Sequence, residues 1–156
     1  MFRFRFAASL SLALLTILRF AAPTPAGEQV PFKGSLEGTV TRSLPPPPIS
    51  VLVEGSGTAT ELGRFAVRIP HLVVPPNAAG SSQFVAANGD TLTADLTGVS
   101  APAGTGFLYI VETATITGGT GRFAGATGSF VCERLYDIAA GTTVGSFAGT
   151  ISSPGS

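Results

Sequence analysis

The chain has 156 residues, of which 44% are hydrophobic and 12% are charged, and its formal net charge is zero. This length supports one domain with a substantial core. After residue 26 the chain carries no basic cluster, so a nucleic-acid partner is not expected. Cys132 is the only cysteine and His71 the only histidine, which excludes an intramolecular disulfide and a transition-metal site built on several such ligands. We therefore expect no metal and no cofactor. We interpret Cys132 as a small buried hydrophobe, with a reactive thiol as the alternative.

Residues 1–26 have the pattern of a secretory signal peptide. Two arginines precede an apolar run at residues 7–18, which is too short to span a bilayer, and Thr24 and Ala26 occupy the −3 and −1 positions of a cleavage site. We predict a signal peptide at 1–26 and a single β domain at 27–156, secreted or periplasmic and free of the membrane after cleavage. Removal of three of the nine basic residues would leave a net charge of about −3.

The remaining chain alternates apolar and polar residues with the period of a strand. From Val30 to Val40 the apolar side chains fall on one face, and RFAVRIP and TLTADLT repeat the pattern. Breakers rich in Gly and Pro separate the segments, and Asn88-Gly89 indicates a two-residue hairpin turn. These signals predict eight strands near residues 30–41, 50–60, 64–74, 82–88, 91–98, 107–117, 123–136 and 142–151. Eight such strands are typical of an all-β fold, either a closed antiparallel barrel or a two-sheet β-sandwich.

The glycine-rich run TITGGTGRFAGATGSF, residues 115–130, does not have the features of a phosphate-binding loop. It lacks the lysine that such a loop requires, and the residues after it predict a strand where a helix should begin. We interpret it as a strand, a turn built on Gly118, Gly119 and Gly121, and a returning strand bent by its own glycines. Glycines permit the bulges and corners that a small barrel needs in order to close.

Four segments of the chain, VPFKGSLEGTVT, GSGTATELGRFAVR, ATITGGTGRFAGATGSF and GSFAGTIS, carry a family resemblance. Together they resemble the small secreted bacterial proteins related to the allene oxide cyclase and dirigent barrels, over nearly all of residues 27–156. The resemblance implies a single eight-stranded antiparallel barrel and an apolar cavity at its centre. It implies no chemistry, because the catalytic residues of the plant cyclases match no positions here.

Glu112, in the segment FLYIVETATI, is the candidate catalytic residue. It shares a strand face with the apolar residues from Leu108 to Ile116. If that face points into the barrel, apolar surroundings would raise the pKa of the Glu112 carboxyl and make it a candidate acid or base. If the opposite face, with Phe107 and Tyr109, points inward, Glu112 is a surface carboxylate. The alternation alone leaves both arrangements open.

Three residues are candidate ligand-binding residues: Tyr109, Arg134 and Tyr136. Arg134 and Tyr136 share one face of the strand that follows Glu112, and they are equally compatible with a place on the rim. His71 is interpreted as a hydrogen-bonded residue at a strand end, with the role of a base as the alternative.

Three functions remain compatible with the sequence. The first, which we favour, is a barrel that binds a small apolar molecule. The second is an isomerase or cyclase acting on a hydrophobic substrate, which needs an acid in the cavity beside a hydrogen-bond donor. The third is a structural or interaction module whose barrel is filled by side chains. A homo-oligomer is compatible with each of them. A membrane-spanning barrel is disfavoured because the chain has no Trp and two Tyr.

Overall fold

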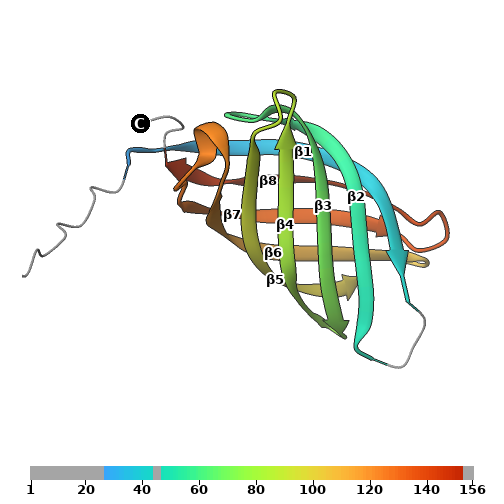
Figure 1. Ribbon diagram of the computed structural model, residues 1–156. Helices are drawn as coiled ribbons and strands as arrows, with labels where there is room; N and C mark the ends of the chain where they lie inside the picture. The colour runs from blue at the N-terminus through green and yellow to red at the C-terminus, as the bar shows by residue number, and fades with distance from the viewer. Residues whose placement is uncertain (1–26, 44–46, 153–156) are drawn as a thin grey trace, which may run out of the picture.

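The structure, a computed structural model, describes residues 27–43 and 47–152, so the predicted signal peptide lies outside the described residues. The chain is a closed barrel in which each strand pairs antiparallel with the next and the last strand pairs with the first (Figure 1). The strands are β1 (Gln29–Arg42), β2 (Ile49–Ala59), β3 (Gly63–Val74), β4 (Asn77–Ala86), β5 (Thr91–Pro102), β6 (Phe107–Gly119), β7 (Gly128–Asp137) and β8 (Thr142–Ser152), with one 3₁₀ turn, η1 (Gly121–Phe123). The predicted eight-stranded barrel is confirmed, and the β-sandwich alternative is wrong.

Two strand boundaries differ most from the prediction. Strand β4 begins at Asn77 because residues 75–76 alone make the turn after β3, which leaves residues 77–81 free to pair with β5. Strand β7 begins only at Gly128, since the residues after β6 first form the η1 turn and a short loop. Both differences lie in segments where turn-forming residues are so frequent that the pattern does not show where pairing begins.

The glycine-rich run contains a bulge, but the bulge lies in β6 and not in the returning strand, because Gly118 and Gly119, predicted to form the turn, still belong to β6. Gly118 has a φ of 132°, which favours glycine, and it lies where the register between β5 and β6 shifts. Thr93 pairs with Gly118, but the next residue, Ala94, pairs with Ile116, so β6 carries one extra residue. Such a bulge increases the local twist and bend of a strand, which helps a sheet of eight strands to close.

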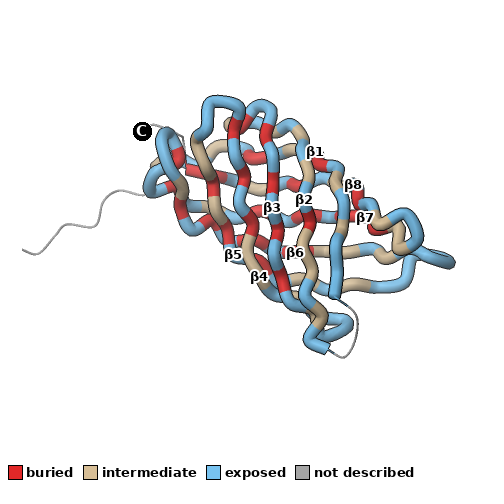
Figure 2. The backbone as a smooth tube through the Cα atoms, turned by 45° about the vertical axis from the view of Figure 1, so that its right-hand side comes forward, coloured by how far each residue is buried: buried red, intermediate tan, exposed pale blue. Residues whose placement is uncertain are grey.

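Burial alternates along the strands (Figure 2). Every second side chain therefore points into the barrel. At one end the interior is filled by phenylalanine rings whose centroids lie 5.0 to 6.4 Å apart: Phe32, Phe65, Phe84, Phe130 and Phe147. Leu62, in the β2–β3 turn, and Phe123, in η1, are also buried at this end. Truncation of one such ring to alanine typically costs about 3–5 kcal/mol, so this half of the barrel is the stabilising core. No helix within the described ranges is long and apolar enough to cross a membrane.

Candidate functional site

The half of the barrel away from the phenylalanines contains a cavity of about 480 Å³. It opens at the end where β1, β3, β5 and β7 finish, and its size is within the range of about 300–1,000 Å³ that is usual for small-molecule sites. Most inward positions of this half carry side chains smaller than phenylalanine, and the two larger ones, Arg134 and Tyr136, fill only part of the space between the walls. The apolar walls include Val40, Val51, Val73, Ala78, Leu108 and Ile110.

A buried ion pair between Glu112 and Arg134 lies at the bottom of this cavity. Both side chains are at most 2% exposed. Nε of Arg134 donates to Oε2 of Glu112 at 3.0 Å, and Nη2 donates to Oε1 at 2.6 Å. This two-pronged geometry holds the guanidinium and the carboxylate in one orientation. It also cancels their charges, which is the condition for keeping either of them away from water.

His71 faces the same cavity from β3 and is 8% exposed. Its Nδ1 lies 3.0 Å from the carbonyl oxygen of Ile69. Because a carbonyl only accepts, Nδ1 carries the proton of the neutral ring, and Nε2 then holds a free lone pair. Burial lowers the pKa of His71, and the nearby charges of Glu112 and Arg134 act on it in opposite directions. The ring is therefore neutral at pH 7, with Nε2 as a hydrogen-bond acceptor.

Glycines on the neighbouring strands make room for these three polar residues. Gly98 pairs with Glu112, Gly145 pairs with Arg134 and Gly80 pairs with His71. A Cβ atom at Gly98 would lie 2.6 Å from Cγ of Glu112, and one at Gly145 would lie 2.6 Å from Cγ of Arg134. At Gly80 it would lie 2.5 Å from Cβ of His71. Each polar side chain thus occupies space that any larger residue opposite would take.

The structure brings together three of the four residues that the sequence suggested. Glu112, Arg134 and Tyr136 all line the cavity and are buried. The alternative of a surface carboxylate at residue 112 is therefore wrong. Tyr109 is the exception: it lies on the outer wall, 41% exposed, because it has the opposite parity to Glu112 on β6. It cannot contact a ligand inside the barrel.

His71 is the cavity residue that the sequence reasoning did not select. It is hydrogen-bonded, as expected, but it lies inside the barrel and not at the end of its strand. The available signal was its parity with Phe65, Val67 and Ile69, which all point inward. A polar residue on the apolar face of a strand either finds a partner or faces a cavity.

Cys132 points inward beside the ion pair, and it is buried as predicted. Burial and the nearby Glu112 carboxylate raise the pKa of its thiol to about 12. The reactive thiolate is therefore strongly disfavoured in the folded protein. Within residues 27–43 and 47–152, no three His, Cys, Asp or Glu side chains are grouped as a metal site would require.

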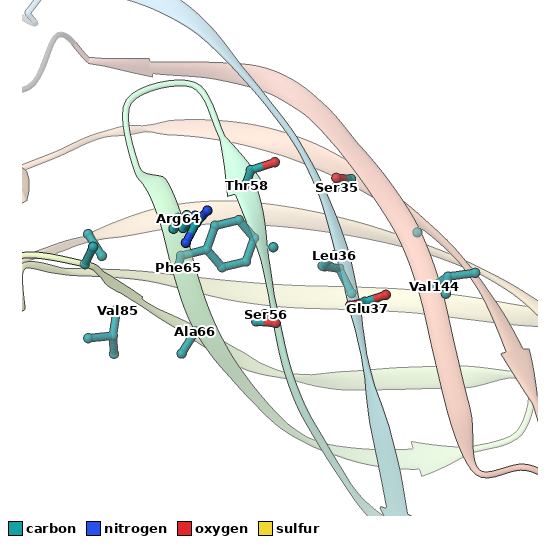
Figure 3. A pocket seen from close by; sticks show the side chains of 14 residues that line it. Ser35, Leu36, Glu37, Ser56, Thr58, Arg64, Phe65, Ala66, Val85 and Val144 are labelled. Carbon is teal, nitrogen blue, oxygen red and sulfur yellow. The ribbon is translucent and has the colours of Figure 1, made fainter.

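A second hollow lies on the outer wall and extends from β8 across β1, β2 and β3 to β4 (Figure 3). It is larger, at about 870 Å³, but Ser35, Glu37, Thr58 and Arg64 around it are exposed to solvent. Charges in water interact weakly and a shallow surface excludes little solvent. The internal cavity, with its apolar walls and buried polar residues, is therefore the candidate site.

The fold is that of the dirigent-like eight-stranded barrels, as the sequence resemblance implied. The structure of the pterocarpan synthase dirigent protein GePTS1 is similar, with a TM-score of 0.62 and 13% identity, over 88% of this chain and 98% of that one. The pterocarpan synthase dirigent protein PsPTS1 has a TM-score of 0.59 and 11% identity, over 83% of this chain and 97% of that one. The sequence matches no protein-family model and no curated protein. At these identities the likeness is one of fold.

Proposed function

We propose that this protein binds a small, mainly apolar molecule in the open half of its barrel. The observation that carries the proposal is the uneven filling of the interior, with phenylalanines packed at one end and a cavity of about 480 Å³ at the other. Closed barrels of eight strands either fill their interior or hold one small ligand, and a cavity with apolar walls and a few polar groups is typical of the second kind.

A titration with N-phenyl-1-naphthylamine, an uncharged probe whose fluorescence rises in apolar surroundings, tests this proposal. Ala78 lines the cavity, whereas Ala79, the next residue of β4, is exposed on the outside. We expect one probe per barrel, at least tenfold weaker binding in Ala78→Phe, and unchanged binding in the matched Ala79→Phe control. Equal affinities in the two variants would place the probe outside the barrel and refute the proposal.

A second candidate function is an isomerase or cyclase acting on a hydrophobic substrate. The observation that favours it is the position of Glu112 in the cavity beside a hydrogen-bond donor, Arg134. Both carboxylate oxygens already accept from Arg134, so the group best placed to take up a proton is Nε2 of His71. If a compound that co-purifies with the protein is converted on incubation, His71→Gln should abolish its turnover. Full turnover by this variant would refute the role of His71.

We also propose that the protein acts outside the cytoplasm. The support is the pattern of residues 1–26 and the apolar run at 7–18. Sequencing the N-terminus of the protein purified from its own host should find Gly27 as the first residue. A protein that keeps Met1 and stays in the cytoplasmic fraction would contradict this proposal.

A further inference from the structure

The bottom of the cavity presents a hydrogen-bond donor that has no oxygen or nitrogen partner among residues 27–43 and 47–152. We call His71, Glu112 and Arg134 the cavity floor. Nε and Nη2 of Arg134 donate to Glu112, and no oxygen or nitrogen atom of the described residues accepts from Nη1. The Cys132 thiol lies beside the guanidinium, but sulfur is a weak acceptor. Among the same residues, Oγ of Ser82 is the one side-chain oxygen or nitrogen that is both shielded from solvent and without a hydrogen-bond partner. Nη1 of Arg134 is therefore not shielded, and it is accessible from the cavity that Arg134 lines. A guanidinium nitrogen only donates, and it therefore requires an acceptor.

The cavity floor also presents one acceptor. Nδ1 of His71 is engaged by the carbonyl of Ile69, which leaves the lone pair on Nε2 for a donor in the cavity. A hydroxyl group is the donor that suits a neutral imidazole, since it has one proton to give. An incoming ligand thus meets a donor from β7 and an acceptor from β3.

The summed charge of the floor is zero. The Glu112 carboxylate and the Arg134 guanidinium neutralise each other at 2.6 Å, and the His71 ring is neutral at pH 7. The remaining charged lining residue, Arg42, is exposed at the mouth. An anionic group at the floor would add an uncompensated charge next to the Glu112 carboxylate in a poorly solvated space, which is unfavourable. The floor therefore favours an uncharged polar group.

We infer that the barrel selects an uncharged ligand with an apolar body and, at its buried end, an oxygen acceptor bound by Arg134 and a hydroxyl bound by His71. A hydroxylated carbonyl compound is the simplest class with both groups. Glu112 acts here as a positioning residue, because it orients the guanidinium and does not contact the ligand. This inference rests on the proposed function, since it names the class of ligand for the same cavity.

Four probes with one naphthalene body test the inference by calorimetry at pH 7.5. We expect 2-acetylnaphthalene, which has only an acceptor, to bind at least about tenfold more tightly than 2-ethylnaphthalene, because hydrogen bonds to charged groups have that strength. For 2-naphthol, whose hydroxyl meets His71, we expect a gain of about fivefold. We expect 2-naphthoate, which is anionic, to bind more weakly than 2-acetylnaphthalene.

Two variants assign these preferences to residues. His71→Leu should bring the ratio of affinities for 2-naphthol and 2-ethylnaphthalene close to one and leave the preference for 2-acetylnaphthalene. The double variant Glu112→Leu/Arg134→Met should do the reverse. It replaces the buried pair by apolar residues of similar size, a change that proteins often tolerate, whereas removal of one partner would leave a buried charge. Circular dichroism and thermal unfolding check that each variant is folded.

The outcomes separate this inference from the proposed function. If 2-ethylnaphthalene binds and the polar probes bind no better, the cavity is real and the selectivity is refuted. If 2-naphthoate binds most tightly, the floor is an anion site and the inference is wrong. If no probe binds to the folded protein, the proposed function and this inference are both wrong.

Discussion

The buried pair of Glu112 and Arg134 should be coupled far more strongly than a surface pair of the same residue types. Glu54 and Arg68 provide the comparison within the same barrel, because they also lie on adjacent strands and their shortest distance is 3.0 Å. Their side chains are 56% and 63% exposed, against 2% and 1% for the buried pair. Two double-mutant cycles, one for each pair, therefore measure how burial changes the coupling energy between a glutamate and an arginine.

The expected magnitudes follow from solvation. Removal of one partner of a buried pair costs about 3–5 kcal/mol, because the other charge is left in a poorly solvated site, while removal of both is often close to neutral. The coupling energy of the buried pair should therefore be at least about 3 kcal/mol. The exposed pair should show about 0.2–1 kcal/mol, since water and salt screen it.

The cycles use Glu112→Leu and Arg134→Met, and Glu54→Leu and Arg68→Met, each singly and together. Urea unfolding at pH 7.5 followed by circular dichroism gives the free energies. The complete loss of folding in one buried single variant, with recovery in the double variant, would support the same conclusion. A coupling below about 1 kcal/mol for the buried pair would show that water reaches it in solution, and it would refute the argument for a fixed, neutral cavity floor.

Three further predictions follow from the residues around the cavity. Burial lowers the pKa of His71 in the folded state, so below pH 6.5 the unfolded chain binds a proton that the folded chain does not. The free energy of unfolding should therefore fall as the pH drops from 6.5 toward the folded pKa. Relative to His71→Gln, the slope should be up to about 1.4 kcal/mol per pH unit. Parallel pH profiles for the two proteins in urea unfolding would contradict this. The pKa of the Cys132 thiol is raised from 9.0 to about 12 in the folded protein, so little reactive thiolate is present at pH 8. Cys132 should therefore react with iodoacetamide at least about 1,000-fold more slowly in the folded protein than in urea, as measured by mass spectrometry. Fast labelling of the folded protein would show that the thiol is accessible. Gly98→Ala should destabilise the barrel by about 1–3 kcal/mol in urea unfolding and remove the preference for 2-acetylnaphthalene, because the new Cβ would lie 2.6 Å from Cγ of Glu112. The control is Thr97→Ala, at the exposed neighbouring position. Equal stabilities of the two variants would show that β5 can move away from Glu112.

Strand alternation was sufficient to predict most of the barrel. The period-two pattern marked β1, β3 and β5 because one face of each strand is apolar and the other polar. The pattern was less informative for β6, where Leu108 and Ile110 lie on one face and Phe107, Tyr109 and Val111 on the other. With apolar residues on both faces, alternation does not show which face is inward, and Tyr109 was placed wrongly for this reason.

The composition and local pattern by themselves determined the all-β class, the number of strands and the approximate positions of most turns. These features depend on residues close together in the chain. Only the tertiary structure decided that Glu112 faces inward, that Arg134, 22 residues away, neutralises it, and that His71 faces them. It also decided that one half of the barrel is filled and the other open. Both features depend on how side chains from strands far apart in the sequence pack across the barrel, and a local sequence pattern does not contain that information.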